Sequence, residues 1–167
     1  MIPVASILVA LVIASIPASR WLARRTGAGR GVSFIFFLGG AGVLAATLPY
    51  RINYYGFLFC EVHGLFGMAN LWDPQNYLNT ALYVPPAFFG YLVFRRPVVL
   101  ALGLAAGSAV IEALQMFSDR VCSTTDFTFN VIGSVVGIAA ARILTTALQK
   151  LRYRSDERRV DTIASRQ

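Results

Sequence analysis

The sequence SAVIEALQMFSDRVCSTTDFTFNVIGSVVG, residues 108–137, joins two apolar segments through a short polar connection and carries charged and amide side chains inside both segments. Such side chains are costly in hydrocarbon unless they face the interior of a helix bundle and find partners there. An ionisable or amide group within a membrane-length apolar segment therefore marks a candidate functional site. The stretch predicts both a membrane fold and the part of it where function should be sought.

The composition of the whole chain agrees with a membrane environment. Of its 167 residues, 56% are hydrophobic and 14% are charged, whereas about 25% are charged in an average soluble domain. The net charge of +7 would also suit nucleic acid, but the basic residues lie in short clusters between apolar segments. This distribution favours membrane topology over a nucleic-acid partner.

Five segments are apolar and long enough to be transmembrane helices, since about 20 residues cross the hydrocarbon core. They comprise residues 2–19, 32–48, 76–94, 98–117 and 127–148. The first has no basic residue before it, so we expect it to be retained rather than cleaved as a signal peptide. Residues 50–75 are rich in aromatic side chains, which favour the headgroup region, and should lie along the membrane surface or dip into it. The sequence thus predicts an all-α, polytopic helical membrane bundle.

The distribution of Lys and Arg predicts the orientation of this bundle, because cytoplasmic loops carry an excess of these residues. A basic loop at residues 20–31, the Arg95–Arg96 turn and the C-terminal tail together hold twelve of them. The opposite side holds only Arg51 and Arg120. We therefore expect the N-terminus outside and the C-terminus in the cytoplasm. The predicted organisation is one transmembrane domain, 1–149, followed by a basic cytoplasmic tail, 150–167.

Helical periodicity places the polar side chains of residues 108–137 on two continuous faces. The fourth segment has the spacing i, i+4, i+7 at Ser108, Glu112 and Gln115. The fifth has the spacing i, i+4, i+7, i+11 at Asp126, Asn130, Gly133 and Gly137. Because a short connection joins the two segments, they should be antiparallel neighbours whose backbones approach closely at the two glycines. Ser108 is expected to be a small packing residue.

A polar residue of the third segment is predicted at the same depth in the membrane as Glu112 and Asn130. At 1.5 Å per residue, Glu112 and Asn130 lie about 6–8 Å from the outer ends of their helices. Asn79 enters the third segment from the same side at a similar depth. Arg120, in the connection, is the nearest cation and is placed to pair with Asp126 at the mouth of the bundle. The polar residues either fix the helix register or form a ligand site.

These residues also carry a family resemblance. The pattern Asn79-x5-Pro85, Glu112-x2-Gln115, Arg120 and Asp126-x3-Asn130-x2-Gly133-x3-Gly137 resembles the VanZ-like family of bacterial integral membrane proteins, over residues 73–144. The chain departs from the family after Val84, where Pro85-Pro86-Ala87 replaces a single proline followed by an apolar residue and glycine. The resemblance implies a multi-pass protein of the bacterial plasma membrane. The family's namesake is associated with resistance to the glycopeptide teicoplanin, without an established reaction, and fold transfers better than phenotype.

The two cysteines and the single histidine are the remaining candidates for a disulfide or a metal site. Cys60 and Cys122 fall in segments expected outside, where oxidation is permitted. Both a disulfide that ties the 50–75 segment to the mouth of the bundle and two free thiols fit the sequence. His63 stands near Glu61, but no second histidine or cysteine pair has metal-ligand spacing. We therefore expect neither a metal nor another cofactor.

Two functions follow from these observations. The first is a non-enzymatic protein that binds a lipid-like or lipoglycopeptide ligand at the outer leaflet and contributes to glycopeptide resistance. Its candidate ligand-binding residues are Asn79, Glu112, Gln115, Arg120, Asp126 and Asn130. The second is an intramembrane enzyme that modifies a lipid or cell-wall precursor, with Glu112 as general base and Arg120 holding a phosphate. The expected partners are membrane lipids and such a ligand, and the sequence predicts no oligomeric state.

Overall fold

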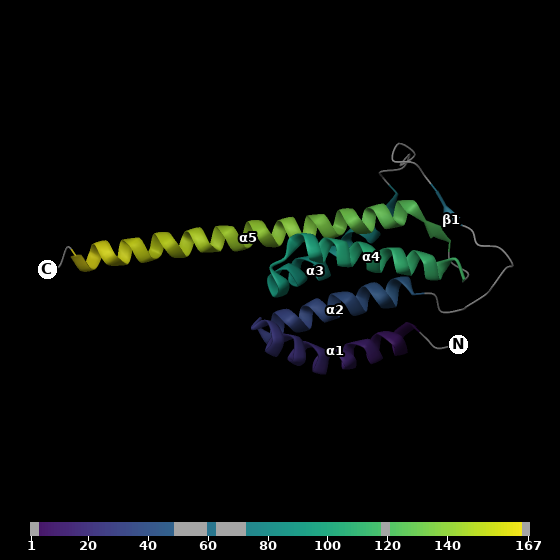
Figure 1. The fold of residues 1–167 in the computed structure, drawn as a ribbon, viewed down its shortest axis with the longest axis horizontal. Coiled ribbons are helices and arrows are strands. Elements are labelled where there is room, and N and C mark those ends of the chain that lie inside the picture. Colours follow the sequence, from purple (N-terminus) through teal and green to yellow (C-terminus); the bar gives the residue numbers. More distant parts are fainter. Residues whose placement is uncertain (1–3, 49–59, 63–72, 118–120, 165–167) are drawn as a thin grey trace.

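A computed structural model describes residues 4–48, 60–62, 73–117 and 121–164. Within these ranges the chain forms five helices, α1 (Val4–Thr26), α2 (Arg30–Thr47), α3 (Pro74–Phe94), α4 (Pro97–Gln115) and α5 (Thr124–Ala164) (Figure 1). Two short strands, β1 (Cys60–Glu61) and β2 (Cys122–Ser123), pair in parallel. The predicted all-α helical bundle is confirmed.

Four of the helices are long and apolar enough to cross a membrane. These candidate spans are Ala5–Thr26, Arg30–Thr47, Pro97–Gln115 and Thr124–Ser155. Their outer faces leave large apolar side chains exposed, such as Val9, Val99 and Val136. A surface of this kind is typical of helices that face lipid tails. The chain is a membrane protein. Of the five predicted membrane spans, four correspond to helices that are long and apolar enough to cross, and α3 is the one that does not.

The helix α3 differs because its neighbours shield it. It packs against α2, α4 and α5, and it buries Asn76, Asn79 and Tyr83. Polar side chains are tolerated in a membrane when they face the bundle interior rather than lipid. This shielding explains how a central helix of 21 residues can be polar in its first two turns.

Local signals set both ends of α3. Asp73 is the N-cap residue, and its Oδ1 accepts a hydrogen bond of 2.9 Å from the backbone N–H of Gln75. Pro74 follows at the first position, where its missing N–H is not needed. The helix ends at Arg95, which has a left-handed backbone with φ of 55°, and Pro97 then begins α4. The two-residue turn predicted between these helices is confirmed.

Gly133 and Gly137 of α5 pack against a different helix from the one predicted. A Cβ added to Gly137 would lie 2.5 Å from the carbonyl oxygen of Val84 and 2.8 Å from the Cβ of Ala87. A Cβ added to Gly133 would overlap the carbonyl group of Thr80. The expectation that these glycines pack on the fourth helix was therefore wrong, because their partner is α3. Connection length indicates antiparallel neighbours but gives no signal for α3, which runs parallel to α5.

Two predicted boundaries were also wrong. The residues Arg20, Arg24 and Arg25 lie within α1, which continues to Thr26, rather than in a loop. The helix α5 does not end near residue 148 but continues to Ala164, so most of the expected tail is helical. At about 1.5 Å per residue, its 41 residues extend about 60 Å, roughly twice the thickness of the hydrocarbon core. The C-terminal part of α5 accordingly projects beyond the other helices (Figure 1).

The bundle has two chemically different ends. The connections at residues 27–29 and 95–96 and the projecting part of α5 lie at one end, which we call the basic end (Figure 1). The end of α2, the start of α3, the end of α4 and the start of α5 lie at the other, which we call the cavity end. The termini lie at opposite ends of the bundle. Which end faces the cytoplasm stays a prediction.

Candidate functional site

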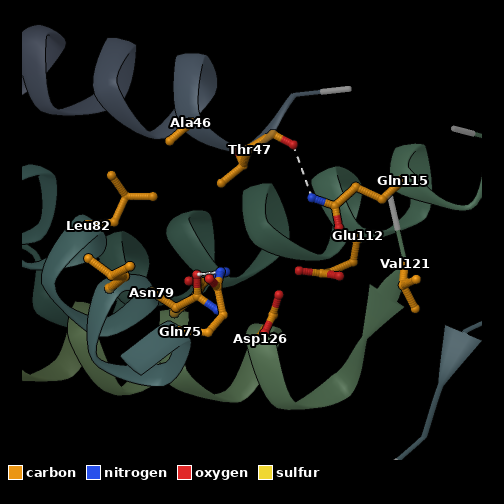
Figure 2. A pocket seen from close by; sticks show the side chains of 11 residues that line it. Ala46, Thr47, Gln75, Asn79, Leu82, Glu112, Gln115, Val121 and Asp126 are labelled. Atoms are coloured by element: carbon orange, nitrogen blue, oxygen red, sulfur yellow. Dashed lines mark hydrogen bonds between the residues drawn. The ribbon is translucent and has the colours of Figure 1, made fainter. Parts of the chain in front are cut away.

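A cavity of about 530 Å³ lies at the cavity end, between α2, α3, α4 and α5 (Figure 2). Its polar lining residues are Thr47, Gln75, Asn79, Glu112, Gln115, Asp126 and Asn130. Five of the six predicted ligand-binding candidates are thus brought together, although they come from three helices. Arg120 lies outside the described residues, so its predicted pairing with Asp126 is not described.

Sequence reasoning missed two polar residues of the lining. Gln75 precedes Asn79 by one helical turn, and its Nε2 donates a hydrogen bond of 3.3 Å to the Oδ1 of Asn79. Extending the polar spacing of the third segment backwards by four residues would have found it. Thr47 has no comparable signal in the sequence, because its backbone carbonyl rather than its side chain pairs with Gln115.

Hydrogen bonds between helices position the amide side chains. The Nε2 of Gln115 donates to the carbonyl oxygen of Thr47 at 3.0 Å. That carbonyl belongs to the last turn of α2, where backbone acceptors have no partner within the helix. The Nδ2 of Asn130 donates to the Oγ of Ser108 at 3.0 Å. Ser108 is therefore a hydrogen-bond partner that joins α4 to α5, and the expectation that it only fills space was incomplete.

Glu112 is held by the last residue of β2, which precedes α5. Its side chain is 7% exposed, and its Oε2 accepts a hydrogen bond of 2.9 Å from the backbone N–H of Ser123. Beside Ser123, Cys122 forms a disulfide with Cys60, with the two Cα atoms 4.5 Å apart. The carboxyl group thus has a structural partner as well as a place in the cavity wall.

Two polar atoms in the cavity wall have no partner. Asn79 and Asn130 are 6% and 3% exposed. Within the ranges that the structure describes, neither the Nδ2 of Asn79 nor the Oδ1 of Asn130 makes a hydrogen bond. A buried polar atom without a partner costs about 1–3 kcal/mol. One donor and one acceptor in the wall therefore lack partners among the described residues, and both atoms are buried, so a bound molecule reaches them only when the amide groups turn toward the cavity.

The acidic side chains determine which molecules would suit the cavity. Figure 2 shows Glu112 and Asp126 pointing into the same space. None of the described lining residues is Lys, Arg or His. Carboxyl oxygens accept hydrogen bonds from hydroxyl, amide and ammonium groups. The described residues contain no cluster of three or more His, Cys, Asp and Glu that could hold a metal ion, and His63 lies outside them.

A comparison with protein families gives one result. The family model described as VanZ/LLP1 matches residues 2–145. The match includes α1 and α2, in which the sequence showed no diagnostic motif, and it ends where α5 begins to project. No curated protein and no solved structure matches the chain.

Proposed function

Since the chain belongs to the VanZ/LLP1 family and is a membrane protein, we propose that it binds a lipid-like or lipoglycopeptide ligand. The ligand's polar group occupies the cavity lined by Asn79, Glu112 and Asn130. In this proposal the cavity end faces the outer leaflet of a bacterial plasma membrane. Binding there contributes to glycopeptide resistance and requires no chemical reaction.

The observation that carries this proposal is the unpaired donor and acceptor of Asn79 and Asn130. If these amides only fixed the helix register, all of their polar atoms would be expected to find partners in the bundle, as buried polar atoms do. Once the amides turn toward the cavity, a ligand hydroxyl or amide can donate to the Oδ1 of Asn130 and accept from the Nδ2 of Asn79. The nearby carboxyl groups of Glu112 and Asp126 provide further acceptors for the same polar group.

The size and wall of the cavity limit what enters. A volume of about 530 Å³ lies within the usual range for small-molecule sites, about 300–1,000 Å³. It accommodates one sugar or a lipid headgroup, which is only part of a lipoglycopeptide. Leu78, which is 63% exposed, and Leu82 line the same cavity. These apolar residues supply a surface for an acyl chain beside the polar group.

The decisive variant is Asn79→Leu. It removes an unpaired buried donor together with the acceptor of the 3.3 Å bond from the exposed Gln75, so the stability of the free protein should change little. If the proposal is correct, the same change abolishes ligand binding, because the ligand loses its donor. Wild type expressed in a glycopeptide-sensitive Gram-positive host should reduce susceptibility to teicoplanin, and Asn79→Leu and Glu112→Gln should not. Unchanged susceptibility with wild type would refute the resistance role.

Direct binding is measured separately with purified protein. Teicoplanin should raise the melting temperature of the wild type in detergent, because a ligand that binds only the folded state stabilises it. The control variant Val110→Ala, whose residue is 59% exposed on α4, should show the same rise. Equal rises in wild type and Asn79→Leu would show that teicoplanin binds elsewhere.

An enzymatic function is the second candidate, and the two carboxyl groups in one cavity support it. In this case Glu112 acts as a general base on a lipid or cell-wall precursor. Extracts of expressing cells should then contain an altered lipid or precursor species that disappears in Glu112→Gln. Identical mass spectra from cells with and without the protein would exclude this candidate.

A further inference from the structure

A second cavity, of about 690 Å³, lies at the basic end. We call it the basic-end groove. Its walls are mostly apolar, with Phe36 from α2, Val93 from α3 and Leu100 and Leu104 from α4. One cationic side chain, Arg96, also lines it. The groove shares no lining residue with the cavity of the proposed function.

The two adjacent arginines at this end have different surroundings. The guanidinium group of Arg95 lies 6.0 Å from the centre of the Tyr91 ring, within cation–π distance. The guanidinium group of Arg25 lies 5.8 Å from the ring of Trp21 in the same way. Arg96, by contrast, lines the groove. Of these three arginines, only Arg96 lines the basic-end groove; Arg95 lines a smaller cavity of about 210 Å³ beside α5.

The positive charge around the groove determines which kind of molecule it would bind. The sequence contains four arginines at residues 20–31 and two at residues 95–96, and no Asp or Glu in either segment. An electropositive surface attracts anionic groups, and basic pockets between transmembrane helices bind anionic lipid headgroups. The groove also reaches exposed apolar side chains of the lipid-facing surface, Phe94 at 39% and Val99 at 63%. Its occupant must therefore be apolar along most of its length and anionic at the end near Arg96.

We propose that the basic-end groove binds an anionic phospholipid. One acyl chain lies along the apolar wall that includes Val99 and Leu104, and the phosphate pairs with the guanidinium group of Arg96. Guanidinium suits this contact because its planar set of N–H donors matches phosphate oxygens. The lipid enters laterally from the leaflet at the basic end. This site is independent of the cavity at the other end, so neither proposal depends on the other.

Two pairs of variants distinguish lipid binding in the groove from non-specific attraction by surface charge. Arg96→Gln and Arg95→Gln remove the same charge from adjacent residues, but only Arg96 lines the groove. Gly103→Phe and Gly107→Phe add the same ring one helical turn apart on α4. A Cβ at either glycine meets nothing within 4 Å, so both variants should fold, yet only Gly103 lines the groove.

The measurement is native mass spectrometry of the full-length protein in detergent, titrated with phosphatidylglycerol or phosphatidylcholine. Wild type should retain phosphatidylglycerol about fivefold more strongly than phosphatidylcholine, because both lipids offer a phosphate to Arg96 but the choline cation of phosphatidylcholine is repelled by the basic end. Arg96→Gln should lose this preference, and Arg95→Gln should keep it. Gly103→Phe should lose both lipids, whereas Gly107→Phe should bind like wild type. Melting temperatures in the same detergent check that the variants are folded.

Several outcomes would overturn the proposal. Equal retention of the two lipids by wild type shows that no headgroup is recognised. Equal losses in Arg95→Gln and Arg96→Gln show that diffuse surface charge is responsible. Unchanged lipid binding in Gly103→Phe shows that the groove is not the site. A wild-type dimer that Gly103→Phe dissociates shows that a second copy of the chain, rather than a lipid, fills the groove.

Discussion

The two ends of the bundle accommodate polar groups in opposite ways. At the cavity end, Glu112, Gln115 and Asn130 are 7%, 5% and 3% exposed, and they bond to other elements of the fold. At the basic end, Arg25 and Arg95 are exposed and contact rings on their own helices. Buried polar groups require partners from elsewhere in the bundle, whereas peripheral arginines reach water and headgroups unaided. The cavity end should therefore be sensitive to substitution and the basic end tolerant.

The largest expected effect compares two glycines. Gly133→Leu forces a side chain into the backbone of Thr80, which cannot move without displacing α3. Overpacking of this kind typically costs about 1–3 kcal/mol, and a clash with backbone should reach or exceed the upper value. Gly103→Leu, at the basic-end groove, enters open space and should leave the melting temperature nearly unchanged. Equal losses of melting temperature in detergent would show that the two ends are packed alike.

The next effect concerns the disulfide at the cavity end. Cys60 and Cys122 are 62 residues apart in the sequence, and closing a long loop stabilises a fold by about 2–4 kcal/mol. A reducing agent should lower the melting temperature of the wild type. The double variant Cys60→Ala, Cys122→Ala should melt at the lower temperature with or without the agent. Two thiols that react in freshly isolated membranes would contradict both the disulfide and an oxidising environment at the cavity end.

A smaller effect is expected from the bond between Asn130 and Ser108. Hydrogen bonds between membrane helices average about 0.6 kcal/mol, with values up to about 1.7 kcal/mol. A double-mutant cycle of Asn130→Ala and Ser108→Ala should therefore give a coupling energy of about 0.6–1.7 kcal/mol by thermal unfolding. Thr146→Ala, which removes a bond to the carbonyl of Arg142 within the exposed part of α5 near the basic end, should change stability by less than about 0.5 kcal/mol. A coupling energy near zero would show that the bond between Asn130 and Ser108 stabilises the fold no more than an exposed bond in α5 does.

The sequence predicted the cavity because its determinants are local and periodic. Glu112 and Gln115 follow helical spacing, as do Asp126 and Asn130, and depth from the helix ends placed Asn79 at the same level. These rules need no knowledge of which helices are neighbours. Five of the six candidates consequently line one cavity.

What the sequence did not predict depends on parallel packing and on backbone atoms. The contact of Gly133 with Thr80 joins α5 to α3, and no short connection reveals that parallel pair. The acceptor for Gln115 is a backbone carbonyl at Thr47, and any residue type would provide it. The end of α5 was placed too early because an apolar run stops near residue 148, while Lys150 and Arg152 are good helix formers that continue the helix in water.

The smallest expected effect belongs to Arg95→Gln. The exposed side chain loses its contact with Tyr91, and an exposed cation–π contact is worth about 0.5–1 kcal/mol. The left-handed backbone at this position, with φ of 55°, is equally available to glutamine, so the end of α3 should persist. The change also leaves most of the twelve basic residues of the predicted cytoplasmic side, so the orientation should persist.

Thermal unfolding of Arg95→Gln and a fluorescent protein fused to the C-terminus test both expectations in one strain. The fusion should fluoresce equally with wild type and variant if the C-terminus stays in the cytoplasm. Arg95→Gly is the matched control, because it loses the same contact while relieving the left-handed backbone, and it should melt no lower than Arg95→Gln. A loss of fluorescence, or a destabilisation as large as that of Gly133→Leu, would mean that an arginine of the basic end is structural. Tolerance of polar groups at that end would then depend on specific partners, as it does at the cavity end.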